Sequence, residues 1–226
     1  MTITLVVPIL GPPAVGKTTL TLAVGGNARR HTFRLRDQVP ADVLVTTAGT
    51  AGGLGWIDTD IVDQTLRTYL HSIVRRGIDV VLMDNFPGSA EQVSLLFDAL
   101  AQSAPRARVE PIEMCAASNV VRNRARHRRV CQRCEKDPVA DPRIPAMSSL
   151  LDGWKCSKCG ALLHSRRGDA SRLFKARTKR FDRSIDDIRA AFMAHGVEVT
   201  ILDATLPAEH TARLVEPMLN SRSTIS

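Results

Sequence analysis

The sequence predicts an α/β fold in which a mostly parallel, doubly wound sheet carries helices on both faces. Short runs of aliphatic and β-branched residues alternate along the chain with longer segments of helical periodicity, and this alternation is typical of that fold class. The chain has 226 residues, of which 44% are hydrophobic, so it is long enough for one domain core with an insertion.

The first half of the chain begins with an apolar run that leads into a glycine loop. Residues 3–10 are apolar except for Thr4, as in a strand covered on both faces, and the loop is followed by a helix expected over 17–28. Residues 31–36 are compatible with a short strand. Residues 60–76 have helical periodicity, and Gly77 stands where a helix C-cap is expected.

The second half continues the alternation around a segment of different composition. Residues 131–164 are rich in Pro, Gly and Ser and hold four of the five cysteines, which indicates a small insertion. The expected strands are 78–83, 108–115 and 197–202, and the expected helices are 89–101, 119–129, 169–195 and 208–219.

Basic residues are mostly arginines and are concentrated in one region. Arginine accounts for 25 of the 31 basic residues, and residues 122–189 carry a net charge of +11 in a chain whose net charge is +8. Because the guanidinium fork matches pairs of phosphate oxygens, this region predicts a polyphosphate ligand or nucleic acid; a solvated basic face is the alternative. No stretch is apolar enough to span a membrane, and the first residues lack the features of a signal peptide, so we expect no membrane partner.

The segment from Gly11 to Thr18, G-P-P-A-V-G-K-T, matches a phosphate-binding loop at every fixed position and lies between an expected strand and an expected helix. In such a loop the backbone N–H groups face an anion, Lys17 reaches the β- and γ-phosphates of ATP, and the Thr18 hydroxyl is a ligand of Mg²⁺. Asp84 ends a buried strand, from which a carboxylate orients Mg²⁺ and its waters; alternatively it only caps the next helix. The residues expected to bind the nucleotide within the loop are Gly11, Ala14, Val15, Gly16, Lys17, Thr18 and Thr19.

Four cysteines form two Cys-x-x-Cys pairs, Cys131 with Cys134 and Cys156 with Cys159, separated by 21 residues. This spacing predicts a tetrahedral zinc site. Because four thiolates leave no open position on the metal, the zinc is expected to be structural; a redox role for either pair is the alternative. This use of cysteine is typical of a reducing compartment, so we expect the protein in the cytoplasm.

Together with the phosphate loop, three further motifs resemble the adenylate kinase family of nucleoside monophosphate kinases, in its zinc-lid form. Asp84-Asn-Phe-Pro-Gly88 is similar to the family's Asp-Gly-Phe-Pro-Arg motif, and the end of the last expected strand, Leu202-Asp-Ala, is similar to the family's terminal strand. A pair of arginines precedes the first cysteine pair, and another pair follows the second. The resemblance implies the three-layer fold of P-loop NTPases, with a kinase core over 1–128 and 166–226 and a zinc-binding lid over 129–165.

The resemblance also implies roles for the arginines around the lid. Arg124 would lie against the adenine of ATP, and Arg128 would contact the ATP phosphates. Arg166 and Arg177 would bridge donor and acceptor. The catalytic residues expected on this basis are Lys17, Asp84, Arg128, Arg166 and Arg177, and the protein is expected to be a monomer that acts on a small molecule.

On the acceptor side the chain departs from the family's pattern. Gly88 stands in place of the arginine that clamps the acceptor phosphate, and residues 31–37 replace a Ser-Thr-Gly-Asp segment, so that Arg34 or Arg36 would have to compensate. Trp56, within the acceptor-binding segment expected over 37–75, would stack on a ring or only pack beneath the following helix. The residues expected to bind the acceptor are Arg36, Trp56, Ile57, Gln92, Arg166 and Arg177.

These observations lead us to expect an ATP- and Mg²⁺-dependent phosphotransferase that converts a nucleoside monophosphate, AMP or a related nucleotide, to a diphosphate and releases ADP. A kinase for a hydroxyl group of an uncharged or modified metabolite is an alternative, since it explains the missing clamp, and it would need a general base such as Asp84 or Asp37. The second alternative is a zinc-bearing nucleic-acid-binding module switched by ATP, which the scarcity of aromatic residues in the basic region disfavours.

Overall fold

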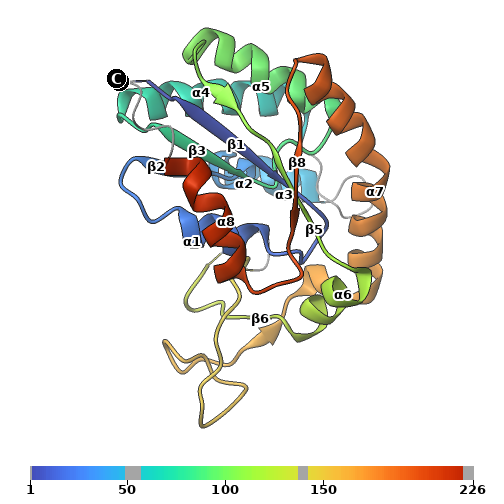
Figure 1. The fold of residues 1–226 in the computed structure, drawn as a ribbon. Helices are drawn as coiled ribbons and strands as arrows, with labels where there is room; N and C mark the ends of the chain where they lie inside the picture. The colour runs from blue at the N-terminus through green and yellow to red at the C-terminus, as the bar shows by residue number, and fades with distance from the viewer. Residues whose placement is uncertain (1, 49–56, 137–141, 221–226) are drawn as a thin grey trace.

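The computed structural model describes residues 2–48, 57–136 and 142–220. Its centre is a six-stranded sheet in which every pairing is parallel, in the order β2-β3-β1-β5-β8, with the short strand β4 also beside β1 (Figure 1). The strands are β1 (Leu5–Leu10), β2 (Arg30–Phe33), β3 (Val80–Asp84), β4 (Arg108–Val109), β5 (Ile112–Cys115) and β8 (Thr200–Asp203).

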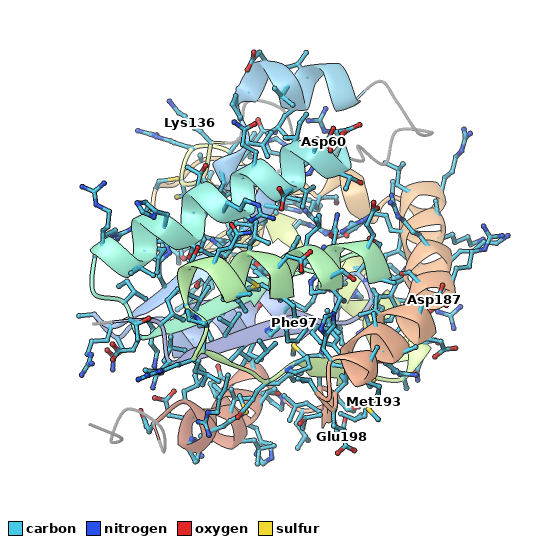
Figure 2. All side chains as sticks on the ribbon, turned by 90° about the horizontal axis from the view of Figure 1, so that it is seen from above. Asp60, Phe97, Lys136, Asp187, Met193 and Glu198 are labelled. Atoms are coloured by element: carbon cyan, nitrogen blue, oxygen red, sulfur yellow. The ribbon has the colours of Figure 1, made fainter. Side chains whose placement is uncertain are left out.

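Helices cover both faces of the sheet. The helices α1 and α8 pack on one face, and α4, α5 and α7 pack on the other (Figure 1). Figure 2 shows Phe97 on α5 and Met193 near the end of α7. The two helices are in contact at this end, since the Phe97 ring stacks on the ring of His195 with 4.0 Å between the ring centroids. The helices are α1 (Lys17–Val24), α2 (Leu35–Gln38), α3 (Ala41–Ala48), α4 (Thr59–Arg75), α5 (Ala90–Ser103), α6 (Ser118–His127), α7 (Ser171–Ala194) and α8 (Ala208–Asn220), with a 3-10 turn, η2, over Arg167–Asp169.

The apolar run of β1 is explained by this two-sided cover. Successive side chains of a strand point to opposite faces of its sheet. Val6 and Leu10 accordingly pack in the core beneath α4, α5 and α7, whereas Val7 and Ile9 pack in the core beneath α1 and α8. The α/β fold with a mostly parallel sheet is therefore confirmed.

Several expected strands differ in their details, and the one expected over 197–202 is found as β8 at Thr200–Asp203. The expected strand over 108–115 is divided into β4 and β5 at Glu110 and Pro111, because proline has no N–H to give to a ladder. The expected strand over 31–36 is shorter, since the chain leaves β2 after Phe33 and turns into α2. Among the described residues, no helix is both long and apolar enough to cross a membrane.

The segment expected to form an insertion contains a separate two-stranded antiparallel sheet. Its strands, β6 (Arg129–Val130) and β7 (His164–Ser165), pair where the segment leaves and rejoins the larger body (Figure 1). A small core of its own includes Cys131, Cys156 and Leu163, each no more than 3% exposed.

Candidate functional site

The loop between β1 and α1 curls at the carboxyl end of the sheet. Gly11 and Gly16 have φ angles of 140° and 117°, and Ala14 has a φ of 64°. A Cβ on Gly11 would come within 2.6 Å of the backbone oxygen of Met114, so that both the backbone conformation and the close approach require glycine. This curled loop at a helix N-terminus has the form of an anion-binding site.

Lys17, the first residue of α1, turns its side chain back into the loop. Its Nζ donates hydrogen bonds to the backbone oxygens of Gly11 and Pro12, at 2.6 and 2.8 Å. Burial lowers the pKa of Lys17 to about 7; Asp84 opposes this shift, and the nearby Arg177 adds to it. An anion that bound beside the Lys17 amino group would therefore raise this pKa and favour the protonated form.

Asp84 lies beside the loop because β3 is the parallel neighbour of β1, with Ile9 opposite Asp84 in register. Its Oδ2 accepts hydrogen bonds from the Thr18 hydroxyl at 2.8 Å and from Nε of Arg34 at 2.9 Å. The chain can turn sharply after Asp84 because Asn85, with a φ of 61°, tolerates the left-handed conformation. Hydroxyl and carboxylate oxygens are thus brought together at the mouth of the loop.

A cavity of about 630 Å³ opens in front of these residues. Of its charged lining residues in the described part of the chain, nine are basic and one is acidic. They are Lys17, Arg34, Arg36, Asp84, Arg128, Arg143, Arg166, Arg167, Arg177 and Arg180. Such a concentration of positive charge in a concave site favours an anionic ligand.

Asp169 forms ion pairs with three of these arginines. Arg128 donates to both of its carboxylate oxygens at 2.6 Å, and nitrogens of Arg166 and Arg177 lie 3.9 and 3.8 Å from Oδ1. Arg177 also donates to the backbone oxygen of Gly168 at 3.1 Å. Burial, followed by the proximity of Arg128 and Arg177, lowers the pKa of Arg166 to about 10.

A second, smaller cavity of about 330 Å³ is also lined by residues of the loop. Its lining is mainly apolar and includes Val15, Met114 and Pro207. Arg124 lines it too, and its guanidinium donates to the backbone oxygens of Val15 and Ala204 at 3.0 and 2.7 Å. It donates further to the backbone oxygens of Thr205 and Leu206, so Arg124 connects the loop between β1 and α1 to the segment after β8.

The two cavities share several lining residues, which makes them neighbours around one loop. The shared residues are Ala14, Gly16, Thr19, Arg128 and Pro145. A ligand with an apolar ring at one end and several phosphates at the other would match this pair of cavities.

The residues expected on the acceptor side are only partly brought together. Arg36 and Ile57 line the larger cavity, and Ile57 is also part of the core beneath α4 and α5. Gln92 lines the cavity as well, with its Oε1 accepting a hydrogen bond from the backbone N–H of Gly88 at 2.8 Å. Trp56 lies outside the described residues.

The four cysteines of the insertion converge. All four Sγ atoms lie within 4.8 Å of one another, with Cys131 and Cys159 at 3.5 Å and Cys134 and Cys156 at 3.7 Å. Zn–S bonds of about 2.3 Å in a tetrahedron place sulfurs roughly 3.8 Å apart, so this geometry suits a Zn²⁺ ion. The backbone N–H groups of Lys158 and Cys159 lower the pKa of Cys156, which favours the thiolate that a metal binds.

Several cavity residues were not recognised from the sequence as part of a site. Arg143, in the insertion, lines the cavity and pairs with Asp37 at 2.8 Å, and no motif marks it. Arg180 follows Arg177 by three residues on α7, so helical spacing would have placed both on one face. Asp169, which is not a lining residue but contacts three cavity arginines, was also not expected in a site, because these contacts depend on the folded chain.

In comparisons with known proteins, the sequence matches no family model and no curated protein. The function of the chain is therefore inferred from its own residues and their arrangement.

Proposed function

We propose that this protein has a P-loop NTPase fold and is an ATP- and Mg²⁺-dependent phosphotransferase of the nucleoside monophosphate kinase type. It would transfer the γ-phosphoryl group of ATP to a nucleoside monophosphate, giving ADP and a nucleoside diphosphate. The observation that carries the proposal is the pair of cavities around the phosphate loop, one mainly apolar and one lined by nine basic residues.

The donor nucleotide fits this pair of cavities. The smaller cavity is suited to a flat base, beside Val15 and Arg124, and the loop amides with Lys17 are suited to its β- and γ-phosphates. Thr18 and Asp84 bring a hydroxyl and a carboxylate oxygen within 2.8 Å of each other, and these are the oxygen ligands that Mg²⁺ prefers. When bound, Mg²⁺ would neutralise phosphate charge in the site.

The larger cavity is suited to charge compensation during transfer. An oxygen of the acceptor phosphate would form a bond to the γ-phosphorus while the bond between that phosphorus and the leaving oxygen of ADP breaks. Such a reaction depends mainly on positioning the two phosphates and on stabilising negative charge. Arg128, Arg166 and Arg177 all lie within ion-pair distance of Asp169 and all line the cavity.

The insertion is suited to the role of a lid. Arg143 extends from it to form an ion pair with Asp37 of α2, and the backbone oxygen of Pro142 accepts a hydrogen bond from Arg166 at 3.1 Å. A zinc ion on the four cysteines would keep this core-poor segment rigid. A lid over the cavity would exclude water from the reaction.

The alternative of a hydroxyl kinase receives less support. Deprotonating a hydroxyl group calls for a free base within reach. The two carboxylates available for this role are both in ion pairs, Asp84 with Arg34 and Asp37 with Arg143.

The proposal is tested by incubating the protein with ATP, Mg²⁺ and each of the common nucleoside monophosphates, and by following ADP and diphosphate formation. We expect one or more diphosphates, no activity in Lys17→Ala, and a rate reduced roughly 100-fold or more in Arg166→Ala, since a donor to transition-state charge is lost. Arg106→Ala, which removes an exposed arginine between α5 and β4, serves as the control. ADP release without a diphosphate, or no turnover with any monophosphate, would contradict the proposal.

A further inference from the structure

Arg34 lies at the carboxyl end of the sheet, between the phosphate loop and the acceptor side of the cavity. It directly follows β2, whose last residue Phe33 is in register with Met83 of β3. This register sets Arg34 beside Asp84, and the guanidinium donates through Nε to the Asp84 carboxylate at 2.9 Å. The side chain lines the larger cavity and is 19% exposed.

One nitrogen of this guanidinium makes no hydrogen bond within the described part of the protein. Its Nη1 lies 3.8 Å from a carboxylate oxygen of Asp37, whereas its Nη2 is buried and has no hydrogen-bond partner among the described residues. A buried charged donor without an acceptor is costly, and such atoms are rare in folded proteins. An anionic oxygen of a ligand in the cavity would supply the missing acceptor.

The absence of a side chain at Gly88 explains why an arginine is needed in this cavity. Gly88, which lines the cavity after β3, offers no side chain, and its backbone N–H is already given to Gln92. Arg166 and Arg177, which also line the cavity, are shared with Asp169. Among the basic residues that line the cavity in the described part of the chain, Arg34 is therefore the one with a buried nitrogen that has no hydrogen-bond partner.

We propose that Arg34 binds the phosphate of the acceptor and so determines that the acceptor is an organic phosphate and not a neutral compound. This inference rests on the proposed function and names the residue that replaces a clamp at Gly88. Nη2 donates to a phosphate oxygen while Nε keeps its bond to Asp84. A guanidinium fixed in this way acts on the bound phosphate without having to leave its carboxylate partner.

The test measures how much the phosphate of the acceptor contributes to binding. Protein preloaded with Mg²⁺ and a non-hydrolysable ATP analogue is titrated calorimetrically with the four ribonucleoside 5′-monophosphates and with the matching nucleosides. Arg34→Gln removes the charge and keeps a group that can reach Asp84, Arg34→Lys keeps a charge without the fork, and Arg106→Gln is the matched control on the surface. Melting temperatures of all variants show that each is folded.

In the unaltered protein we expect at least one monophosphate to bind more tightly than its nucleoside. Arg34→Gln should lower the affinity for that monophosphate roughly 10- to 100-fold and change the affinity for the nucleoside less than about threefold, because one charge-assisted hydrogen bond is lost. The affinity of Arg34→Lys for the monophosphate should lie between those of the unaltered protein and Arg34→Gln. An equal preference for the monophosphate in Arg34→Gln, or no such preference in the unaltered protein, would overturn the inference.

The transfer assay separates this inference from the proposed function. Turnover of a monophosphate that is insensitive to Arg34→Gln would leave the kinase proposal standing and would remove Arg34 from the acceptor site. Binding that depends on Arg34 without any transfer would support the role of Arg34 in phosphate binding and would contradict the kinase proposal.

Discussion

Asp169 is the residue whose removal is expected to disturb the site most, because a single buried carboxylate faces three arginines. It is only 3% exposed at its side chain, and Arg128, 16% exposed, donates to both of its oxygens. Removing one partner of a buried ion pair costs about 3–5 kcal/mol. The Asp169→Asn side chain keeps one oxygen acceptor, so we expect a loss near the lower end, about 3 kcal/mol in the free energy of unfolding.

This loss of stability corresponds to a decrease in melting temperature that thermal unfolding can measure. For a chain of this size, 1 kcal/mol shifts the melting temperature by about 2–4 °C, so Asp169→Asn should melt roughly 6–12 °C below the unaltered protein. Inorganic tripolyphosphate should close more than half of this gap, because its negative charge takes the place of the missing carboxylate beside the arginines. Asp182→Asn, an exposed position on the same helix α7, is the control and should change the melting temperature by about 1 °C or less.

Two outcomes would refute this reasoning. If Asp169→Asn melted within 1–2 °C of the unaltered protein, as roughly expected of a surface change, the carboxylate would not be holding the arginines. If tripolyphosphate widened the gap, the cavity would not be an anion site organised by Asp169.

Four further predictions follow from other parts of the site. Burial lowers the pKa of Lys17 to about 7 and bound phosphate would raise it, so ATP affinity should fall by up to about tenfold per pH unit above pH 7; Lys17→Met should lose this dependence in calorimetric titrations. Gly11→Ala should cost about 2–4 kcal/mol in urea unfolding, because its Cβ would come within 2.6 Å of the Met114 oxygen, whereas Gly26→Ala, with no atom within 4 Å, should cost less than about 1 kcal/mol. Arg124→Ala should raise the KM for ATP roughly tenfold and leave the KM for the acceptor within about threefold, since it frees the segment after β8 from the loop. Elemental analysis should find one zinc per chain, and Cys156→Ser should lower this content while the larger sheet keeps its circular dichroism signal.

The parts of this protein that could be predicted from the sequence are those encoded by neighbouring residues. The order strand, glycine loop and helix around Lys17 depends on local conformation, and it appears in the structure as β1, loop and α1. The cysteine cluster was predictable for the same reason, because each Cys-x-x-Cys pair is local and a metal needs both pairs.

The parts that could not be predicted depend on which distant residues meet. Arg34 and Arg36 could not be told apart from the sequence; both line the larger cavity, and the register of β2 against β3 sets Arg34 beside Asp84. The pairing of Arg143 with Asp37 joins residues on separate segments, and no spacing rule connects them. The division of β4 from β5 at Pro111 was visible as a proline, but which part would pair with which end of β1 was not.

The claim that this chain transfers a phosphoryl group to a nucleotide is tested most directly by following the group itself. ATP labelled with ¹⁸O in its γ-phosphoryl oxygens is incubated with the protein, Mg²⁺ and an equimolar mixture of AMP, CMP, GMP and UMP, and the products are analysed by mass spectrometry. We predict a diphosphate carrying the label, formed in equal amount with unlabelled ADP. Label recovered only in inorganic phosphate or only in unreacted ATP would contradict the account.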